Sequence, residues 1–106
     1  MAQFDVHRNP GSNHRSTPYV VVVQSAIFDE RPRRVVVPLM KVSAVSVAVR
    51  SPATPFFTID GHELVLLPFD IATVPTRSLG KPVASLAREG DRIVAAIDQL
   101  VTRAYG

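Results

Sequence analysis

Hydrophobic residues alternate with polar ones over short stretches until about residue 85 and then recur at helical spacing. Phe4 and Val6 alternate with polar neighbours, which predicts a first strand with one face on a core. Tyr19–Ser25 is a largely apolar run and predicts a strand buried on both faces. Val35–Val37, just before Pro38, predicts another short strand.

A β-hairpin is indicated in the middle of the chain. Phe57 and Ile59 are spaced two residues apart, as are Leu64 and Leu66, and Asp60 and Gly61 lie between the two pairs. A two-residue Asp-Gly link accepts the positive φ angles of a type I′ turn. Residues 41–50 place valines on one face with period two, although their alanines also permit a short helix.

The segments between these strands carry turn and loop residues. Residues 9–18 are rich in Gly, Ser, Asn and Pro, which predicts an exposed loop. Residues 29–34 are charged and contain a proline, which predicts a second one. Ile71–Val74 lies between Pro68 and Pro75, so this segment is expected at a sheet edge or a bend.

The end of the chain has the period of an amphipathic helix. Its apolar stripe consists of Leu86, Ile93, Ile97, Leu100 and Ala104, flanked by Val94 and Val101. Ser85 can cap the start, while Gly90 weakens the first turns by about 1 kcal/mol relative to alanine. The pattern predicts a helix from about residue 85 to residue 104, with Asp91, Ala95, Asp98 and Thr102 on its outer face.

Length and composition are those of one small sheet-rich domain. The chain has 106 residues, and valine, which suits strands, dominates its apolar content. We therefore predict a single domain over residues 1–106, mainly β, with about five to seven strands between residues 3 and 75 and a C-terminal helix.

The net charge and the lack of targeting patterns limit which classes of partner are expected. The net charge of +3 suits an acidic partner but is small for gripping phosphates, so direct nucleic-acid binding is not expected. The sequence has no cysteine, and its first residues lack the basic and apolar regions of a signal peptide. No apolar run approaches the length of about 20 residues that spans a bilayer. These features predict a cytoplasmic protein without membrane contact.

Few side chains could support catalysis. His7, His14 and His62 lack metal-ligand spacing, and a carboxylate beside a turn, such as Asp60, is commonly a turn former. We expect no catalytic residues, no metal and no cofactor. A basic cluster at residues 31–34 could meet an acidic partner or form a solvated, self-paired loop.

Several segments resemble the CcdB family of toxins, in the family's order. They are Gln3–Val6, Val23–Asp29, Arg33–Leu39, Asp70–Pro75, Leu79-Gly80 and Ile93–Ile97. The resemblance implies a small SH3-like β-barrel with a C-terminal helix, the fold shared with the toxic messenger-RNA endonucleases MazF and Kid. It also implies a twofold homodimer.

The resemblance further implies the toxin of a type II toxin–antitoxin system. In the family, the dimer binds the A subunit of DNA gyrase and traps the cleaved-DNA complex without catalysing a reaction. The family's closing Trp-Gly-Ile triplet aligns without a gap to residues 102–104, and a two-residue shift brings its first two positions onto Tyr105 and Gly106. The implied gyrase-contacting residues are Asp91, Ala95, Asp98, Thr102, Arg103, Ala104, Tyr105 and Gly106.

A CcdA-like antitoxin is the second implied partner, and by resemblance it contacts Ile27, Phe28 and Asp29. Two alternatives are kept. One is a degenerate toxin that binds antitoxin without poisoning gyrase. The other is a MazF-like or Kid-like endonuclease, for which only His14, Arg15 and the loop of residues 31–34 could supply acid–base groups.

Overall fold

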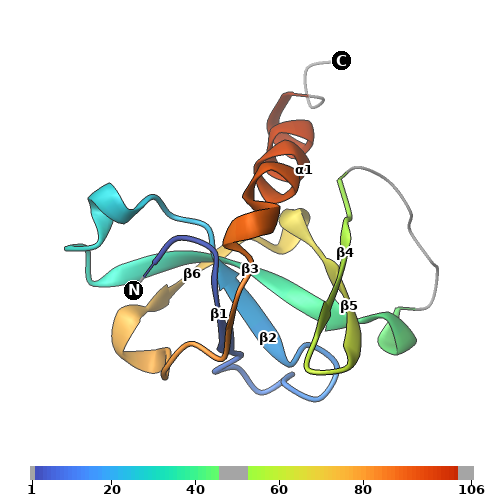
Figure 1. The fold of residues 1–106 in the computed structure, drawn as a ribbon. Coiled ribbons are helices and arrows are strands. Elements are labelled where there is room, and N and C mark those ends of the chain that lie inside the picture. Colours follow the sequence, from blue (N-terminus) through green and yellow to red (C-terminus); the bar gives the residue numbers. More distant parts are fainter. Residues whose placement is uncertain (1, 46–52, 103–106) are drawn as a thin grey trace.

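The computed structural model describes residues 2–45 and 53–102, which form a curved sheet with a helix on top (Figure 1). The strands in these ranges are β1 (Asp5–Arg8), β2 (Tyr19–Val22), β3 (Arg33–Lys41), β4 (Phe56–Ile59), β5 (His62–Leu66), β6 (Ala72–Pro75) and β7 (Ala84–Ser85). The helix is α1 (Gly90–Thr102). Short 3-10 turns join them: η1 (Ala26–Phe28), η2 (Val42–Ala44), η3 (Pro68–Asp70), η4 (Thr76–Ser78) and η5 (Ala87–Glu89).

The strands pair in the order β4-β5-β3-β2-β1-β7, every pairing is antiparallel, and β6 also pairs with β3. The sheet curves into a nearly closed barrel. The expectation of a mainly β, barrel-like fold with a C-terminal helix is confirmed. Six of the described strands lie between residues 3 and 75, within the predicted number, whereas β7 at Ala84–Ser85 lies beyond the range in which strands were predicted.

Strand β3 is longer than predicted, because it does not stop at Pro38. It has nine residues and pairs with β2 on one side over Val36–Leu39. On the other side it pairs with β6 over Arg33–Val36 and with β5 over Leu39–Lys41. Pro38 lies where this second side changes partner, and its carbonyl accepts from the Leu67 amide at 3.1 Å. Proline has no backbone N–H, and at Pro38 none is needed because β3 changes from β6 to β5 there. The strand therefore continues through the proline.

The predicted hairpin is confirmed. Ile59 pairs with His62 around a two-residue turn in which Asp60 has φ 51° and Gly61 has φ 79°. Positive φ at both positions is the requirement of a type I′ turn, whose twist matches that of the flanking strands. The turn fixes the register of β4 and β5.

The sheet has a core on each face. The main core lies between the concave face and α1 and contains Val6, Tyr19, Val21, Val37, Leu39, Phe57, Ile59, Leu64, Leu66, Leu86, Ile93 and Ala96. A smaller one on the other face contains Val20, Val22, Val36 and Leu79. Strand β2 contributes to both and is buried throughout, as predicted from its apolar run.

The helix begins five residues later than predicted. Ser85 does accept from a backbone amide, that of Ala87 at 3.2 Å, but this contact precedes the turn η5, and α1 starts at Gly90. A β-carbon at Gly90 would lie 2.7 Å from the Phe4 ring. Glycine is needed here because the ring packs against the backbone of the first helical turn.

The loops are partly as expected. Residues 9–18 are mostly exposed, and Asn9 stabilises their fold by donating to the Thr17 carbonyl at 2.7 Å. The predicted loop at 29–34 is wrong for Arg33 and Arg34, which belong to β3. Of the ambiguous segment 41–50, Lys41 ends β3 and Val42–Ala44 form η2, whereas residues 46–50 lie outside the described residues.

The contact between Phe4 and Gly90 gives a stability test. Gly90→Ala should lower the free energy of unfolding by about 1–2 kcal/mol, because the clash exceeds the gain in helix propensity. Urea unfolding measures the change. Gly80→Ala is the control, since nothing lies within 4 Å of the added methyl group. The combined change Gly90→Ala and Phe4→Leu should recover part of the loss, and no recovery would contradict the steric explanation.

Candidate functional site

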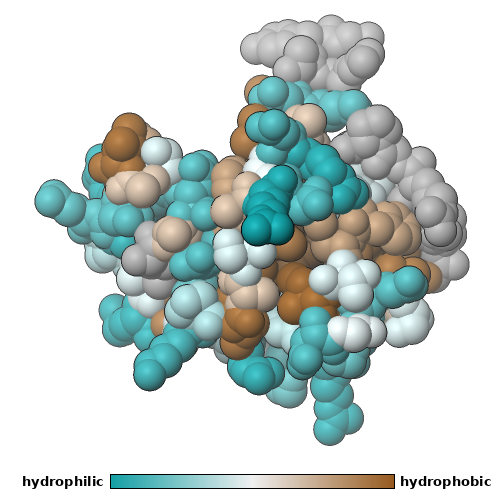
Figure 2. All heavy atoms as spheres, in the orientation of Figure 1, coloured by the Kyte–Doolittle hydropathy of each residue, from teal (hydrophilic) through white to brown (hydrophobic). Residues whose placement is uncertain are grey.

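An apolar tip protrudes from the sheet at η1. Ile27 is 81% exposed and Phe28 is 47% exposed, although both are large hydrophobic residues. Figure 1 shows η1 at the end of an arm away from α1, and Figure 2 shows hydrophobic surface gathered at this end. Exposed apolar side chains at a protruding tip are typical of a protein-binding site. We call residues 24–34 the η1 arm.

Side chains of the η1 arm hold the tip in place. The Ser25 hydroxyl accepts from the Ile27 amide at 3.4 Å and so caps the turn. Gln24 bridges the base of the arm: its amide group donates to the Phe28 carbonyl at 2.9 Å, and its side-chain oxygen accepts from the Val35 amide at 3.0 Å. The tip is thus tied to β3 before any partner binds.

Arg34 is the central fastener of the arm. Only 4% of this residue is exposed, and its guanidinium donates to the carbonyls of Asp29, Arg31 and Arg33. Its Nε lies 3.9 Å from a carboxylate oxygen of Asp29, close enough for ion pairing but without a hydrogen bond. A buried arginine satisfies several carbonyls at once because its donors form a rigid fork.

Basic residues of this cluster therefore divide into two kinds. Arg34 is buried and self-paired, whereas Arg31 and Arg33 are exposed. Arg33 donates to the side chain and the carbonyl of Thr73 on β6, at 3.1 and 2.9 Å. Exposed Arg77 follows Thr76, whose amide donates to the Pro32 carbonyl at 2.9 Å. The exposed Arg31 and Arg33 lie beside the apolar tip, and we call these two residues the basic rim.

The outer face of α1 is the second candidate surface. Asp91, Ala95 and Asp98 are exposed, as the helical pattern predicted. Val94 and Val101 on the flank of the apolar stripe are 45% and 60% exposed. Figure 1 shows the helix rising away from the sheet, so its last described turns stand clear of the barrel.

The remaining residues of that prediction fall at the chain end. Thr102 closes the described helix. Arg103, Ala104, Tyr105 and Gly106 lie outside the described residues.

The first turn of α1 is fastened to the sheet by Arg92. Its guanidinium donates to the Phe56 carbonyl at 3.1 Å, pairs with Glu89 at 3.0 Å and lies 4.6 Å from the centre of the Phe57 ring. Ile93 and Ala96 in the same turns are fully buried. These contacts of the first turns fix the direction of α1, and the later turns continue in that direction.

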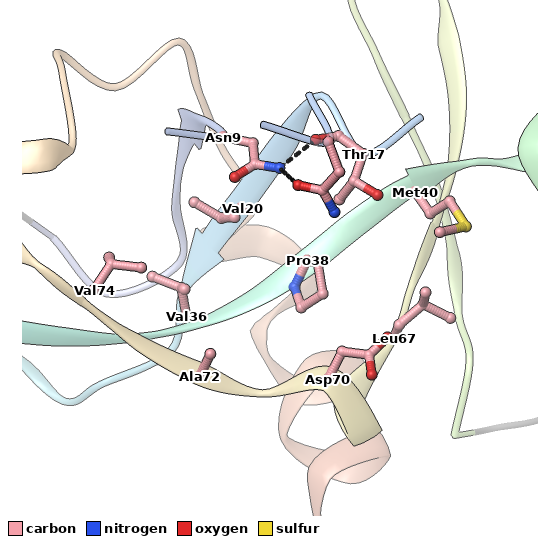
Figure 3. A pocket seen from close by; sticks show the side chains of 11 residues that line it. Asn9, Thr17, Val20, Val36, Pro38, Met40, Leu67, Asp70, Ala72 and Val74 are labelled. Carbon is pink, nitrogen blue, oxygen red and sulfur yellow. Dashed lines mark hydrogen bonds between the residues drawn. The ribbon is translucent and has the colours of Figure 1, made fainter. Parts of the chain in front are cut away.

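A hollow of about 240 Å³ lies on the face of β2, β3 and β6 (Figure 3). Its walls are mostly apolar, and its polar groups are Asn9, Asn13, Thr17 and Asp70. The amide of Asn9 is already bonded to Asn13 and to the Thr17 carbonyl. Asp70 is therefore the one ionisable side chain among the lining residues, and acid–base catalysis on a phosphate needs more than one such group.

The histidines are not brought together. His7 is fully buried, and its Nδ1–H donates to the Gly80 carbonyl at 2.8 Å, which assigns it a structural role. His14 and His62 are exposed. Within residues 2–45 and 53–102, no three His, Cys, Asp or Glu side chains are grouped as a metal would require. No helix in those ranges is long and apolar enough to cross a membrane.

Comparison with known proteins connects these surfaces to a family. The family model described as "CcdB protein" matches residues 3–102. The chain belongs to the CcdB family. The match includes the η1 arm and all of the described helix, so both candidate surfaces are parts of the family domain. The sequence resemblance to this family is confirmed.

The CcdB-like fold extends to a protein of different description. An endoribonuclease from mycobacterial species, solved in complex with its cognate antitoxin, superimposes with a TM-score of 0.74. The alignment covers 96% of this chain and 95% of that one, at 12% sequence identity. At this identity the likeness establishes the fold alone. A search among curated proteins finds no match.

The sequence resemblance names Ile27 and Phe28 but not the residues that hold them in place. Gln24 and Ser25 are not singled out in the sequence, and Arg34 appears there only as a member of the basic cluster at residues 31–34. The short spacing between Ser25 and Ile27 is a recognisable capping pattern, whereas the burial of Arg34 depends on how the arm folds back onto β3.

Loss of the Arg34 fastener is testable. Arg34→Met should lower the free energy of unfolding by about 1–3 kcal/mol, because several carbonyls lose a charged donor. Chymotrypsin should also cleave the variant faster after Phe28. Arg33→Met is the matched control, and as an exposed residue it should shift stability by no more than about 0.5 kcal/mol. Equal effects of both changes would contradict the assigned role.

Proposed function

We propose that this chain is the toxin of a toxin–antitoxin pair, and that it poisons DNA gyrase by binding the gyrase A subunit as a homodimer. The family match over residues 3–102 is the observation that carries the proposal. The free half of α1 supplies a surface that can enter a groove of a large target, because it stands clear of the barrel (Figure 1).

The proposal uses two adjoining strips of the exposed side of α1 for the two associations. The outer face of α1, with Asp91, Ala95 and Asp98, is assigned to gyrase together with residues 102–106 at the chain end. Val94 and Val101 on its flank are assigned to the second copy, because exposed valines gain most when they are buried against an apolar neighbour.

The antitoxin is assigned to the η1 arm. Ile27 and Phe28 supply the apolar anchors, Asp29 lies at the end of the turn, and the basic rim of Arg31 and Arg33 suits an acidic segment. Preorganisation by Arg34 reduces the entropy lost when a partner orders the arm.

The toxin is proposed to act without catalysis. The hollow in Figure 3 supports this, because Asp70 is the single ionisable side chain among its lining residues. Purified protein should leave RNA intact. Cleavage that disappears on substitution of His14 or Arg15 would instead establish the endonuclease alternative.

Removal of Tyr105 and Gly106 tests gyrase poisoning. In cells that lack the antitoxin, induction of the full chain should cause gyrase-linked DNA cleavage, and the truncated chain should cause none. We expect the loss because a terminal aromatic ring is a typical anchor of a small interface. Sedimentation should show the same dimer for both chains, since the buried residues of α1 are retained.

Two outcomes would change this assignment. A truncated chain as toxic as the full one would place the contact on Asp91, Ala95 and Asp98 instead. A full chain that binds antitoxin but never produces cleaved DNA would be the degenerate toxin.

The η1 tip gives a separate test of antitoxin binding. Ile27→Asp should weaken binding of a neutralising CcdA-like antitoxin by about 30-fold or more, as for a central apolar anchor. Its effect on unfolding should stay within about 0.5 kcal/mol, because the side chain is 81% exposed. Ile71→Asp, at an exposed isoleucine of the η3–β6 junction, is the control for calorimetric titration. Unchanged affinity of the Ile27 variant would remove the tip from the antitoxin interface.

A further inference from the structure

Strands β4 and β7 are the two ends of the strand order. Within residues 2–45 and 53–102, each of them pairs with one neighbouring strand. The free side of an edge strand presents backbone N–H and C=O groups that can pair with another chain. We call the space between these two edges the β4–β7 seam.

The register of β4 shows which of its groups face the seam. Ile59 and His62 flank the two-residue turn, and the Leu66 amide donates to the Pro55 carbonyl at 3.0 Å. Because bonded and non-bonded pairs alternate in an antiparallel ladder, Thr58 occupies a non-bonded position and directs its N–H and C=O away from β5.

The neighbouring outward position agrees with this direction. The Phe56 carbonyl, two residues before Thr58, accepts from Arg92 of α1. The helix therefore covers the first part of this edge. Thr58 lies beyond that contact and is exposed.

Strand β7 repeats the arrangement from the other side. The Leu86 amide donates to the Phe4 carbonyl at 2.9 Å, and Ser85 stands opposite Asp5. This bond makes the pair of Ser85 and Asp5 a non-bonded one, so the backbone groups of Ser85 point away from β1. Ser85 is also exposed.

Both edges border one hollow. A space of about 540 Å³ is lined by Thr58 and by Ser85, and its floor is made of Tyr19, Ile59 and Leu86. These floor residues belong to the main core but remain 5%, 6% and 8% exposed. Apolar side chains entering the seam would bury this remaining surface.

The rim of the hollow carries one basic and one acidic side chain. Arg8 at the end of β1 and Asp60 in the hairpin turn both line it, and Val83 is 43% exposed beside them. A segment with an acidic side chain next to Arg8 would therefore meet an opposite charge.

We propose that the β4–β7 seam binds an extended peptide segment of another protein as an added strand. The segment pairs with the backbone groups of Thr58 and Ser85, directs alternate apolar side chains onto Tyr19, Ile59 and Leu86, and places a carboxylate beside Arg8. Strand addition is a general mode of peptide recognition, with affinity from the main chain and selectivity from alternate side chains. The site is separate from the η1 arm and from the outer face of α1, and it does not depend on the proposed function.

A synthetic probe tests the seam. The probe is an acetylated hexapeptide that alternates valine with threonine and ends in glutamate. Titrated into the ¹⁵N-labelled full chain, it should shift the amide signals of Thr58 and Ser85 more than those of the η1 arm. The same peptide with alternate amides methylated should bind at least about tenfold more weakly, because it cannot complete the backbone pairing.

Charge reversal gives the matched control. Arg8→Glu should weaken the glutamate peptide and strengthen a lysine-ended version, each by about threefold to tenfold. The proposal is overturned if neither peptide shifts Thr58 and Ser85 up to its solubility limit, or if methylated and unmethylated peptides bind equally. Shifts at these residues that depend on protein concentration alone would show that a second copy occupies the seam, and would also overturn it.

Discussion

The architecture depends on one strand that has three partners. Strand β3 pairs with β2 along one side and with β6 and then β5 along the other, so it connects the two halves of the sheet. Pro38 marks the change of partner, since the ladder has a gap at the one position where no amide is available. Because β3 begins at Arg33, it also anchors the η1 arm, and the arm's geometry follows from the sheet.

Much of this fold could be predicted from local patterns. The Asp-Gly link identified the hairpin because the turn type is decided by two residues, and the buried run of β2 identified a central strand. Helical spacing identified α1, because the positions of its apolar residues are also a local pattern in the sequence. The predicted start of the helix was five residues too early. The first helical turn packs its backbone at Gly90 against the ring of Phe4, and this contact with the other end of the chain cannot be seen in a local pattern.

Other features depend on long-range contacts that no local pattern contains. Arg34 looks like part of a solvated basic loop until β6 and the arm enclose it, and Pro38 looks like a strand end until β5 and β6 divide the edge between them. The candidate site shows the same division. Ile27 and Phe28 could be named from resemblance, whereas their exposure and the bonds that hold them required the fold.

The family match and the proposed gyrase contact overlap only on α1. The family match ends at residue 102 and includes the sheet, the η1 arm and the turns of α1 that pack on the core. Of the residues proposed to contact gyrase, Asp91, Ala95, Asp98 and Thr102 lie within the match, and residues 103–106 follow it. Since Ile93 and Ala96 fix the helix to the barrel, changes in the last residues alter little of the folded core. The surface proposed for the antitoxin lies on the η1 arm and the surface proposed for gyrase lies on α1 and the chain end, so the two proposals concern different elements and require separate experiments.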